Sequence, residues 1–457
     1  MVPSNPVGPL EGRPPFLWVA AAFLFSFVCF LPNPALPIGN STGLQAGQIL
    51  ALLSLPFVLI SGLPKRQTLV LLLLLLPMLV SGYLVVLSGR ALSNEIVLKS
   101  TIATVLVFLV LVPAGKVANK RYALPLLSGL AWSVMLNVAV GLYQVYSFAR
   151  DEFPLPGLYQ NPSFGSSITE DPESYALYVK RPFGIFPEAS AMAASIGPWL
   201  VLIVGLLLYP KLRHGMRRGL RVQLLLATVS GVALILLSSS GFTVWLLISL
   251  LLVGLPALKD WVLRPHRPGS LIAMIAFVLV GVALVYFSLA YVGSRLDIQE
   301  NSSWSARLAS IVWGISYLGT SPTVLLFGVG PGQSSLLLQS PEALNLLPES
   351  TGEIAVTAVW SIVVNYVQEM GLLGAVALAL TLIIVLRAIV RSSARLVGFS
   401  CLLAWLAGVI LTTSYLPMLP LWLLLGVLLN WDRLFEVRAS EKGLGPDVSV
   451  VPEVVKT

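Results

Sequence analysis

The sequence has little charge, little cysteine and little histidine. Charged residues make up 11% of its 457 positions, whereas hydrophobic residues make up 57%, and the mean hydropathy is +0.89. Soluble globular chains carry roughly 25% charged residues, so this chain has too few polar side chains to cover its apolar ones. We therefore expect an integral membrane protein that uses the bilayer as the solvent for most of its surface.

The scarce cysteines and histidines disfavour whole classes of chemistry. Cys29 and Cys401 lie inside apolar runs and offer neither a disulfide framework nor a metal cluster. His214 and His266 lie in basic connecting segments, away from the longest polar stretches. We therefore expect no metal and no other cofactor, and no catalytic triad that needs histidine.

The long, continuous apolar runs predict an all-α fold, that of a polytopic integral membrane protein. In lipid, each backbone amide needs a partner within the protein, which helices provide, whereas a transmembrane β-barrel would show shorter alternating segments. Windows of roughly 20 apolar residues predict 12 transmembrane helices, at 15-33, 46-63, 68-89, 97-115, 123-148, 191-209, 222-239, 242-258, 270-292, 371-390, 396-413 and 419-431.

Basic residues gather in alternate connecting segments, which places them on one face of the membrane. These segments are Lys65-Arg66, Lys116 to Arg121, Lys211 to Arg221, Lys259 to Arg267 and Arg387 to Arg395. The positive-inside rule assigns that face to the cytoplasm, together with both termini. Membrane orientation thus explains the net charge of +8, and nucleic acid is not an expected partner.

This topology divides the chain into alternating membrane and loop regions. Two large outer, periplasmic loops lie between groups of helices, and no convincing repeat relates the two halves, which weakens a secondary-transporter hypothesis. The predicted regions are 1-148 with five helices, 149-190 as the first outer loop, 191-292 with four helices, 293-370 as the second outer loop, 371-431 with three helices, and 432-457 as a flexible cytoplasmic tail.

Two segments of the second outer loop are candidate helices. Ser303 to Leu318 is a candidate amphipathic helix that lies either at the membrane surface or under the loop as a packing element. Its apolar stripe holds Trp304, Leu308, Ile311 and Ile315. Ile354 to Glu369 is apolar but carries polar residues, and is either re-entrant or an outward extension of the next span.

Three ionisable residues near the end of the first outer loop are candidate site residues. Arg181 offers a planar, permanently charged fork that suits phosphate oxygens, while Lys180 is a more mobile point charge. Both cations could instead contact lipid headgroups. Glu188, just before a span, is a candidate acid or base, or the partner of a nearby arginine in an ion pair.

The second outer loop adds further candidates. Arg307 lies on the amphipathic segment, and Gly330 and Gly332 belong to a glycine-rich turn that either presents amides to an anion or binds no ligand. Asn365 and Glu369 lie close to the start of a span, where an ionisable group is costly unless it has a function or reaches water.

Four segments in order resemble the O-antigen polymerase and ligase superfamily of bacterial membrane glycosyltransferases, most closely its Wzy-type polymerases. They are Arg181 to Ser190, Leu237 to Gly241, Arg307 to Gly332 and Asn365 to Gly374. The first is similar to an Arg, Gly, Phe, Glu-Pro-Ser signature, with Ala189 in place of the proline. The last is similar to an Asn-Tyr, Glu, Gly-Leu-Leu-Gly pattern. Ligases are expected to carry a histidine near this last segment, where this chain has Trp360 and Ser361, which favours a polymerase.

The resemblance implies a fold related to the type-C glycosyltransferases and a metal-independent enzyme of the bacterial inner membrane. Its substrate would be an undecaprenyl-diphosphate-linked oligosaccharide, polymerised into O-antigen or exopolysaccharide at the outer leaflet. Membrane lipid and a Wzz-type chain-length regulator are further expected partners. Remaining hypotheses are an O-antigen ligase acting on lipid A core, a lipid-linked oligosaccharide transporter and a structural scaffold.

Candidate roles follow from that reaction. The catalytic candidates are Arg307 and a base, either Glu188 or Glu369, with the choice between the two left open. Lys180 and Arg181 would join Arg307 in neutralising the diphosphate. Gly330, Gly332 and Asn365 complete the predicted substrate-binding set.

Overall fold

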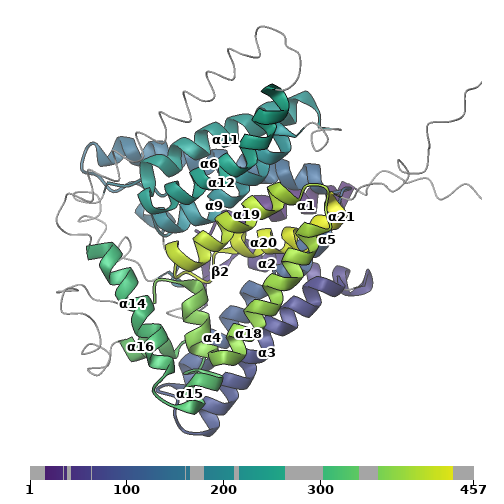
Figure 1. Cartoon of the computed structure of the whole chain (residues 1–457). Helices are drawn as coiled ribbons and strands as arrows, with labels where there is room; N and C mark the ends of the chain where they lie inside the picture. The colour runs from purple at the N-terminus through teal and green to yellow at the C-terminus, as the bar shows by residue number, and fades with distance from the viewer. Residues whose placement is uncertain are drawn as a thin grey trace, which may run out of the picture.

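The computed structural model describes residues 16–33, 35–38, 43–62, 64–159, 161–164, 180–209, 216–262, 302–338 and 359–435. The described fold is helical (Figure 1), which confirms the predicted class, apart from a small antiparallel hairpin of β1 (Ala35–Pro37) and β2 (Gly43–Gln45). The helices are α1 (Phe16–Cys29), α2 (Ala46–Ile60), α3 (Lys65–Leu87), α4 (Asn94–Phe108), α5 (Leu111–Val117), α6 (Ala123–Phe148), η1 (Pro156–Leu158), α9 (Ala189–Leu208), α11 (Arg218–Ser238), α12 (Ser240–Val262), α14 (Ser302–Leu318), α15 (Pro322–Phe327), α16 (Gln333–Leu338), α18 (Ile362–Val390), α19 (Arg395–Ala407), η4 (Gly408–Thr412), α20 (Leu419–Leu428) and α21 (Trp431–Leu434).

Within these ranges, 7 helical stretches are long and apolar enough to cross a membrane. They are α3, α4 with α5, α6, α9, α11, α18, and α19 with η4. Helices α1, α2 and α20 fall in other predicted windows, but their apolar stretches are 10–17 residues long, shorter than the roughly 20 residues that span a bilayer. Helix α12, with 23 residues, falls in the window at 242-258, and its side chains are described only in part. Window 270-292 lies outside the described residues. The number of 12 spans therefore stays a prediction.

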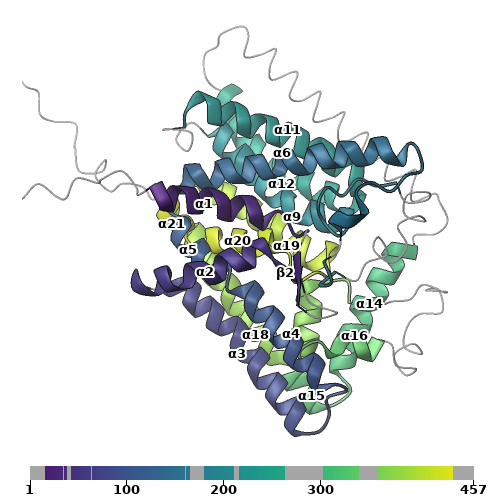
Figure 2. The same ribbon diagram turned by 180° about the vertical axis from the view of Figure 1, so that it is seen from behind.

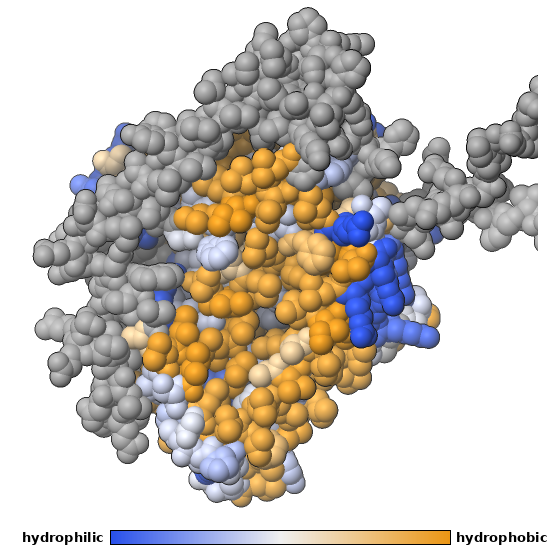
Figure 3. Space-filling view, viewed as in Figure 1, coloured by the Kyte–Doolittle hydropathy of each residue, from blue (hydrophilic) through white to orange (hydrophobic). Residues whose placement is uncertain are grey.

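The outer surface of the bundle is apolar. Only 33% of the apolar window of α18 and 39% of that of α3 is buried inside the protein, and Leu72, Ile102 and Val229 are each more than half exposed. Figure 3 shows hydrophobic residues spread over one face, with hydrophilic ones gathered at one edge. Soluble monomers rarely expose such continuous apolar surface, so lipid is the matching environment.

Helix α9 is the centre of the bundle. In its apolar window 83% of the residues are buried, and it packs against α11, α12, α19 and α20. Small residues permit these close approaches: a Cβ on Gly197 would lie 2.1 Å from the Phe242 ring, and one on Gly205 would lie 2.3 Å from Val397. The start of α9, immediately after Glu188, is consequently held in a fixed position.

The connecting segments that carry Arg66, Lys116 and Arg395 meet at one end of the bundle. Contacts among the connecting segments hold this end together: Arg66 pairs with both oxygens of Asp432 at 2.6 and 2.7 Å, Asn430 donates to the Gly115 carbonyl, and Trp431 donates to the Ala394 carbonyl. We call it the basic end. Helices α14 and α16 lie on the opposite side of the molecule from α5 and α21 in both views (Figures 1 and 2).

The predicted amphipathic helix is present as α14, and the described part of its predicted apolar stripe is not buried. The side chains of Trp304 and Leu308 lie outside the described residues, and Ile311 is partly exposed. Ser310, Trp313 and Gly314 are buried, whereas Ile315 is 57% exposed. A Cβ on Gly314 would lie only 3.2 Å from the Val364 side chain. Small residues on α14 therefore allow it to pack closely on α18, while Val312 and Ile315 face outward.

The described part of segment 354–369 forms a short helix before a break in α18, and whether it is re-entrant or an outward extension of the span stays open. Helix α18 begins at Ile362, after Ser361 accepts a hydrogen bond from the Val364 amide as an N-cap. The helix is interrupted at Gly371, where φ is 67° and ψ is −158°. Residues 354–358 lie outside the described ranges. Glu369 is thus placed immediately before a break in the span.

Candidate functional site

Two amides on α6 position the loop that carries the first-loop candidates. Asn137 and Gln144 are seven residues apart and so lie on one face of the helix. The Gln144 Oε1 accepts hydrogen bonds from the amides of Phe183 and Gly184 at 2.8 and 2.9 Å, and its Nε2 donates to the Gly184 carbonyl at 2.9 Å. The Asn137 Oδ1 accepts from the Ile185 amide at 2.9 Å. These bonds hold the backbone between Arg181 and Glu188 against α6.

Glycine is required at the centre of this loop. Gly184 has a φ of +59°, and a Cβ there would lie 2.6 Å from the Asn137 Oδ1. The Tyr159 hydroxyl donates to the Gly184 carbonyl at 2.8 Å. Burial raises the pKa of the Tyr159 phenol, so the phenol remains a donor at neutral pH. Side chains on α6 and at Tyr159 therefore provide hydrogen-bond partners for the backbone of this loop.

Arg181, Glu188 and Arg307 form an ionic cluster, which we call the Glu188 cluster. Burial raises the pKa of the Glu188 carboxyl, while the positive charges of Arg307 and Arg181 and a hydrogen bond from Ser190 lower it. The Ser190 hydroxyl donates to the Glu188 Oε1. The structure thus brings together three predicted site residues from two distant loops.

Arg307 is held by an aromatic ring and a backbone carbonyl. Its guanidinium carbon lies 4.9 Å from the centre of the Trp360 ring, a cation–π arrangement. Its Nη1 donates to the Thr412 carbonyl at 3.3 Å, at the end of the π-helical turn η4. In the described part of the chain the Arg307 Nε is buried without a hydrogen-bond partner. This N–H is a donor available to an anion.

Ser310 joins α14 to the segment that carries Trp360. Its hydroxyl donates to the Arg307 carbonyl at 2.7 Å and accepts from the Trp360 amide at 3.1 Å. The Ser310 hydroxyl bonds to the backbone of both residues, and it thereby fixes the Trp360 ring relative to the Arg307 guanidinium.

Glu369 belongs to a separate cluster with the glycine-rich turn. Its carboxylate accepts hydrogen bonds from the Ser334 hydroxyl at 3.1 Å and from the amides of Gly332 and Ser334. Its backbone carbonyl accepts from the Gly330 amide at 3.0 Å and from the Ser81 hydroxyl at 2.7 Å. The acceptor held by this turn is therefore the chain's own Glu369 side chain.

The backbone of the turn needs its glycines. Gly328, Gly330 and Gly332 have φ values of 74°, 96° and 74°, which L side chains rarely adopt. A Cβ on Gly371 would lie 2.5 Å from the Gly328 nitrogen. The backbone of the turn at Gly328 therefore packs directly against the backbone of α18 at its break near Gly371. Phosphate binding by Gly330 and Gly332 stays a prediction, and requires the Gly332 amide to exchange partners.

The two remaining candidates differ in their surroundings. Lys180 forms an ion pair with Asp151, and its side chain is 43% exposed. Asn365 is partly buried in the first turn of α18, where its amide donates to the Ser361 carbonyl at 2.9 Å. Neither residue has a described contact with the Glu188 cluster, so their proposed substrate contacts stay predictions.

Sequence reasoning missed residues that shape the site. Asn137 and Gln144 carried a usable signal, because amides inside an apolar window are costly unless they are bonded. Thr412 binds Arg307 through its backbone carbonyl, and the identity of its side chain does not predict that contact. Within the described ranges, no group of three or more His, Cys, Asp or Glu side chains could hold a metal ion; independence from metal stays a prediction.

We predict that Gln144→Leu disrupts the loop before Glu188. Leucine has a similar volume but leaves the Phe183 and Gly184 amides unbonded, at a cost of about 1–3 kcal/mol for each buried donor. Thermal unfolding in detergent should show a clear loss of stability. Gln223→Leu, which removes weaker contacts of 3.3 Å to Ser128, is the control. Equal stability of both variants would contradict the assigned role of Gln144.

The fold and its apolar surface define a multi-pass helical membrane protein. No protein-family model matches the chain, and no curated protein matches it in sequence. Function is therefore inferred from the arrangement of the chain's own residues.

Proposed function

We propose that the chain is a membrane glycosyltransferase that polymerises undecaprenyl-diphosphate-linked oligosaccharide repeats. A sugar hydroxyl of the acceptor repeat attacks the anomeric carbon of the growing glycan. The new glycosidic bond forms as the bond from that carbon to the donor diphosphate breaks, the hydroxyl proton passes to a base, and the lipid diphosphate leaves. The product would be O-antigen or exopolysaccharide.

The observation that carries this proposal is the Glu188 cluster. It combines two arginines with a carboxylate, the pair of functions that neutralisation of a diphosphate and deprotonation of a hydroxyl require. It lies at the start of α9, whereas the segment that follows the end of α9 is basic. Under the positive-inside rule the cluster faces the periplasm of a bacterial inner membrane, beside the outer leaflet.

The geometry favours Glu188 over Glu369 as the base. Arg307 and Arg181 interact electrostatically with Glu188, so a hydroxyl activated there lies near the groups proposed to hold the diphosphate. The carboxylate of Glu369 instead bonds the glycine-rich turn. We assign Glu369 a positioning role: it holds the turn in place, and the turn packs against α18.

Purified protein tests the proposal directly. Incubation with the host's lipid-linked repeats, in detergent with a chelator, should yield a ladder of longer glycans. Glu188→Gln should abolish the ladder, whereas Glu152→Gln, an exposed carboxylate of the same outer region, should preserve it. No ladder from the wild type, or a full ladder from Glu188→Gln, contradicts the proposal. Transfer of the glycan to lipid A core would identify a ligase instead.

The pH dependence of the rate gives a second test. An ordinary glutamate has a pKa of about 4.3, and burial raises that of Glu188. A base acts in its ionised form, so the rate should rise with pH through the raised pKa. We expect an acid limb above the ordinary glutamate range that Glu152→Gln retains. A wild-type rate independent of pH between that range and neutrality contradicts Glu188 as the base.

A lipid-linked oligosaccharide transporter is the second candidate, because α18 is interrupted at Gly371 within a span and transporters bind substrates at interrupted helices. Here, however, the Gln368 and Glu369 carbonyls near the break accept from the Val329 and Gly330 amides, which favours the polymerase. ATP-free flipping of labelled repeats in proteoliposomes, without a glycan ladder, would support transport.

A further inference from the structure

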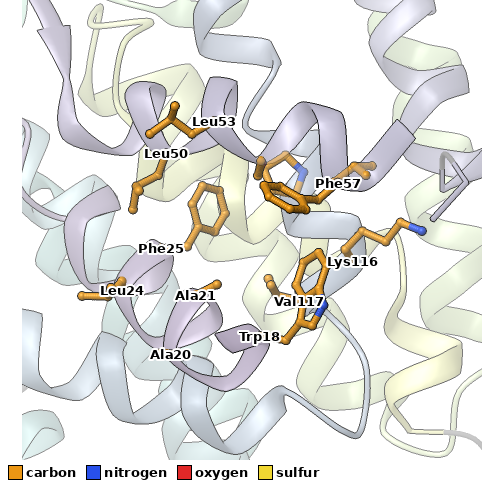
Figure 4. Close-up of a pocket in the computed structure, with 13 residues that line it drawn as sticks. Trp18, Ala20, Ala21, Leu24, Phe25, Leu50, Leu53, Phe57, Lys116 and Val117 are labelled. Carbon is orange, nitrogen blue, oxygen red and sulfur yellow. The ribbon is translucent and has the colours of Figure 1, made fainter. Parts of the chain in front are cut away.

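An apolar groove opens on the side of the bundle formed by α1, α2 and α5. Its volume is about 320 Å³, at the lower end of the range for small-molecule pockets. Trp18, Phe25, Leu50 and Phe57 contribute its apolar walls (Figure 4). The Trp18 and Phe57 rings meet edge to face at 6.4 Å. The groove therefore suits a hydrocarbon chain.

The walls of the groove face the lipid. Leu24 is 47%, Leu53 is 63% and Phe57 is 56% exposed, and all three line the groove. An exposed apolar groove among membrane helices is filled by a hydrocarbon chain more readily than by water. The surrounding bilayer supplies such chains at high concentration.

Among the described residues that line the groove, Lys116 is the cation, and it lies at the end away from Leu24 and Leu50 (Figure 4). The amine of Lys116 donates to the Ser61 carbonyl at 3.0 Å, at the C-terminus of α2. An ammonium group has three N–H donors, so donors remain for a second acceptor. Among the described residues no Asp or Glu lines the groove. The charge of Lys116 is thus left uncompensated by the groove itself.

The groove lies far from the Glu188 cluster. Lys116 is at the basic end, a few residues before α6, whose far end reaches the first outer loop. From the start of α6 at Ala123 to Asn137, which bonds the Ile185 amide beside the cluster, 14 residues of helix correspond to about 21 Å. An occupant of this groove is accordingly distinct from a substrate held by Arg181 and Arg307.

We propose that the groove binds one anionic phospholipid from the leaflet on the basic side. An acyl chain lies against Trp18, Phe25 and Phe57, and a phosphate oxygen accepts a hydrogen bond from the Lys116 amine. The apolar walls provide affinity for any phospholipid, and Lys116 selects for net negative charge. This site is independent of the proposed reaction.

Native mass spectrometry of the full chain tests the site with two lipids of identical acyl chains, phosphatidylglycerol and phosphatidylcholine. The wild-type protein should bind one phosphatidylglycerol about fivefold more tightly than phosphatidylcholine, which is the factor that one cation contributes toward an anionic lipid. Lys116→Gln should remove this preference and still bind both lipids. Lys65→Gln, which alters an exposed cation of the same end outside the groove, should retain it.

Filling the groove tests the hydrocarbon contact separately. Ala21→Trp should lower retention of both lipids without a change in the thermal unfolding midpoint, and Ala21→Phe replaces it if the tryptophan variant does not fold. An unchanged preference in Lys116→Gln overturns the proposal, as does its equal loss in Lys65→Gln. Unchanged retention in the filled variant also overturns it, because another part of this chain or a surface annulus would then explain the groove and the binding.

Discussion

Arg307→Lys is expected to lower the rate of glycan polymerisation by about 100-fold or more, the effect of removing a fixed donor that stabilises developing charge. Lysine keeps the positive charge but loses the planar fork that contacts the Thr412 carbonyl and stacks on Trp360. It also lacks the buried Nε donor of Arg307. The glycan ladder, resolved by size over time, gives the rate.

Arg150→Lys is the matched control for Arg307→Lys. Arg150 also stacks on an aromatic ring, with its guanidinium carbon 4.2 Å from the centre of the Tyr146 ring, but it is exposed and outside the Glu188 cluster. Its variant should polymerise at the wild-type rate. A wild-type rate in Arg307→Lys would show that the fork is unnecessary, and would remove the main support for diphosphate binding by α14.

Gly328→Ala is expected to destabilise the protein by on the order of 3 kcal/mol or more and to abolish polymerisation. The added Cβ would lie 2.3 Å from the Glu369 carbonyl carbon, and φ at this position is +74°. Alanine therefore suffers both a backbone clash and an unfavourable conformation. Relief of the clash separates the glycine-rich turn from α18, which releases the bonds to the Glu369 carboxylate.

The thermal unfolding midpoint in detergent measures this loss. Gly319→Ala, in the turn between α14 and α15, is the control, because its Cβ would approach no atom closer than 3.4 Å and its φ is not left-handed. It should leave the midpoint and the ladder nearly unchanged. An equally stable Gly328→Ala protein would contradict the close packing of the turn on the break in α18.

Much of the fold was predictable because the bilayer imposes a simple rule on the sequence. Apolar windows of sufficient length identified helices such as α3, α6 and α18. The windows did not predict where a helix is divided or whether it faces lipid or protein. The window at 97-115 is divided into α4 and α5 before Pro113, and α20 is almost wholly buried rather than lipid-facing. Length and hydropathy indicate an apolar environment, but not whether lipid or protein supplies it.

The candidate site was predictable as a set of residues and not as an arrangement. Arg181, Glu188 and Arg307 were recognisable as ionisable groups beside spans, where charge needs a partner or a function. Whether Glu188 or Glu369 would lie near the arginines was open, because both precede apolar stretches in the same way. Within the predicted α14 stripe, Ile315 is exposed rather than buried, because close packing on α18 at this point uses the small residue Gly314.

The sequence by itself determined the membrane environment, the helical class and the few positions where charge enters an apolar region. Only the tertiary structure decided that Glu188 lies near Arg181 and Arg307, while Glu369 holds the glycine-rich turn. The physical reason is the range of the contacts. Arg307 meets a carbonyl 105 residues away, and the Glu369 carbonyl accepts from Ser81 across 288 residues. Local hydropathy carries no information about which distant segments meet, because that choice depends on the shapes and hydrogen-bonding needs of the packed helices.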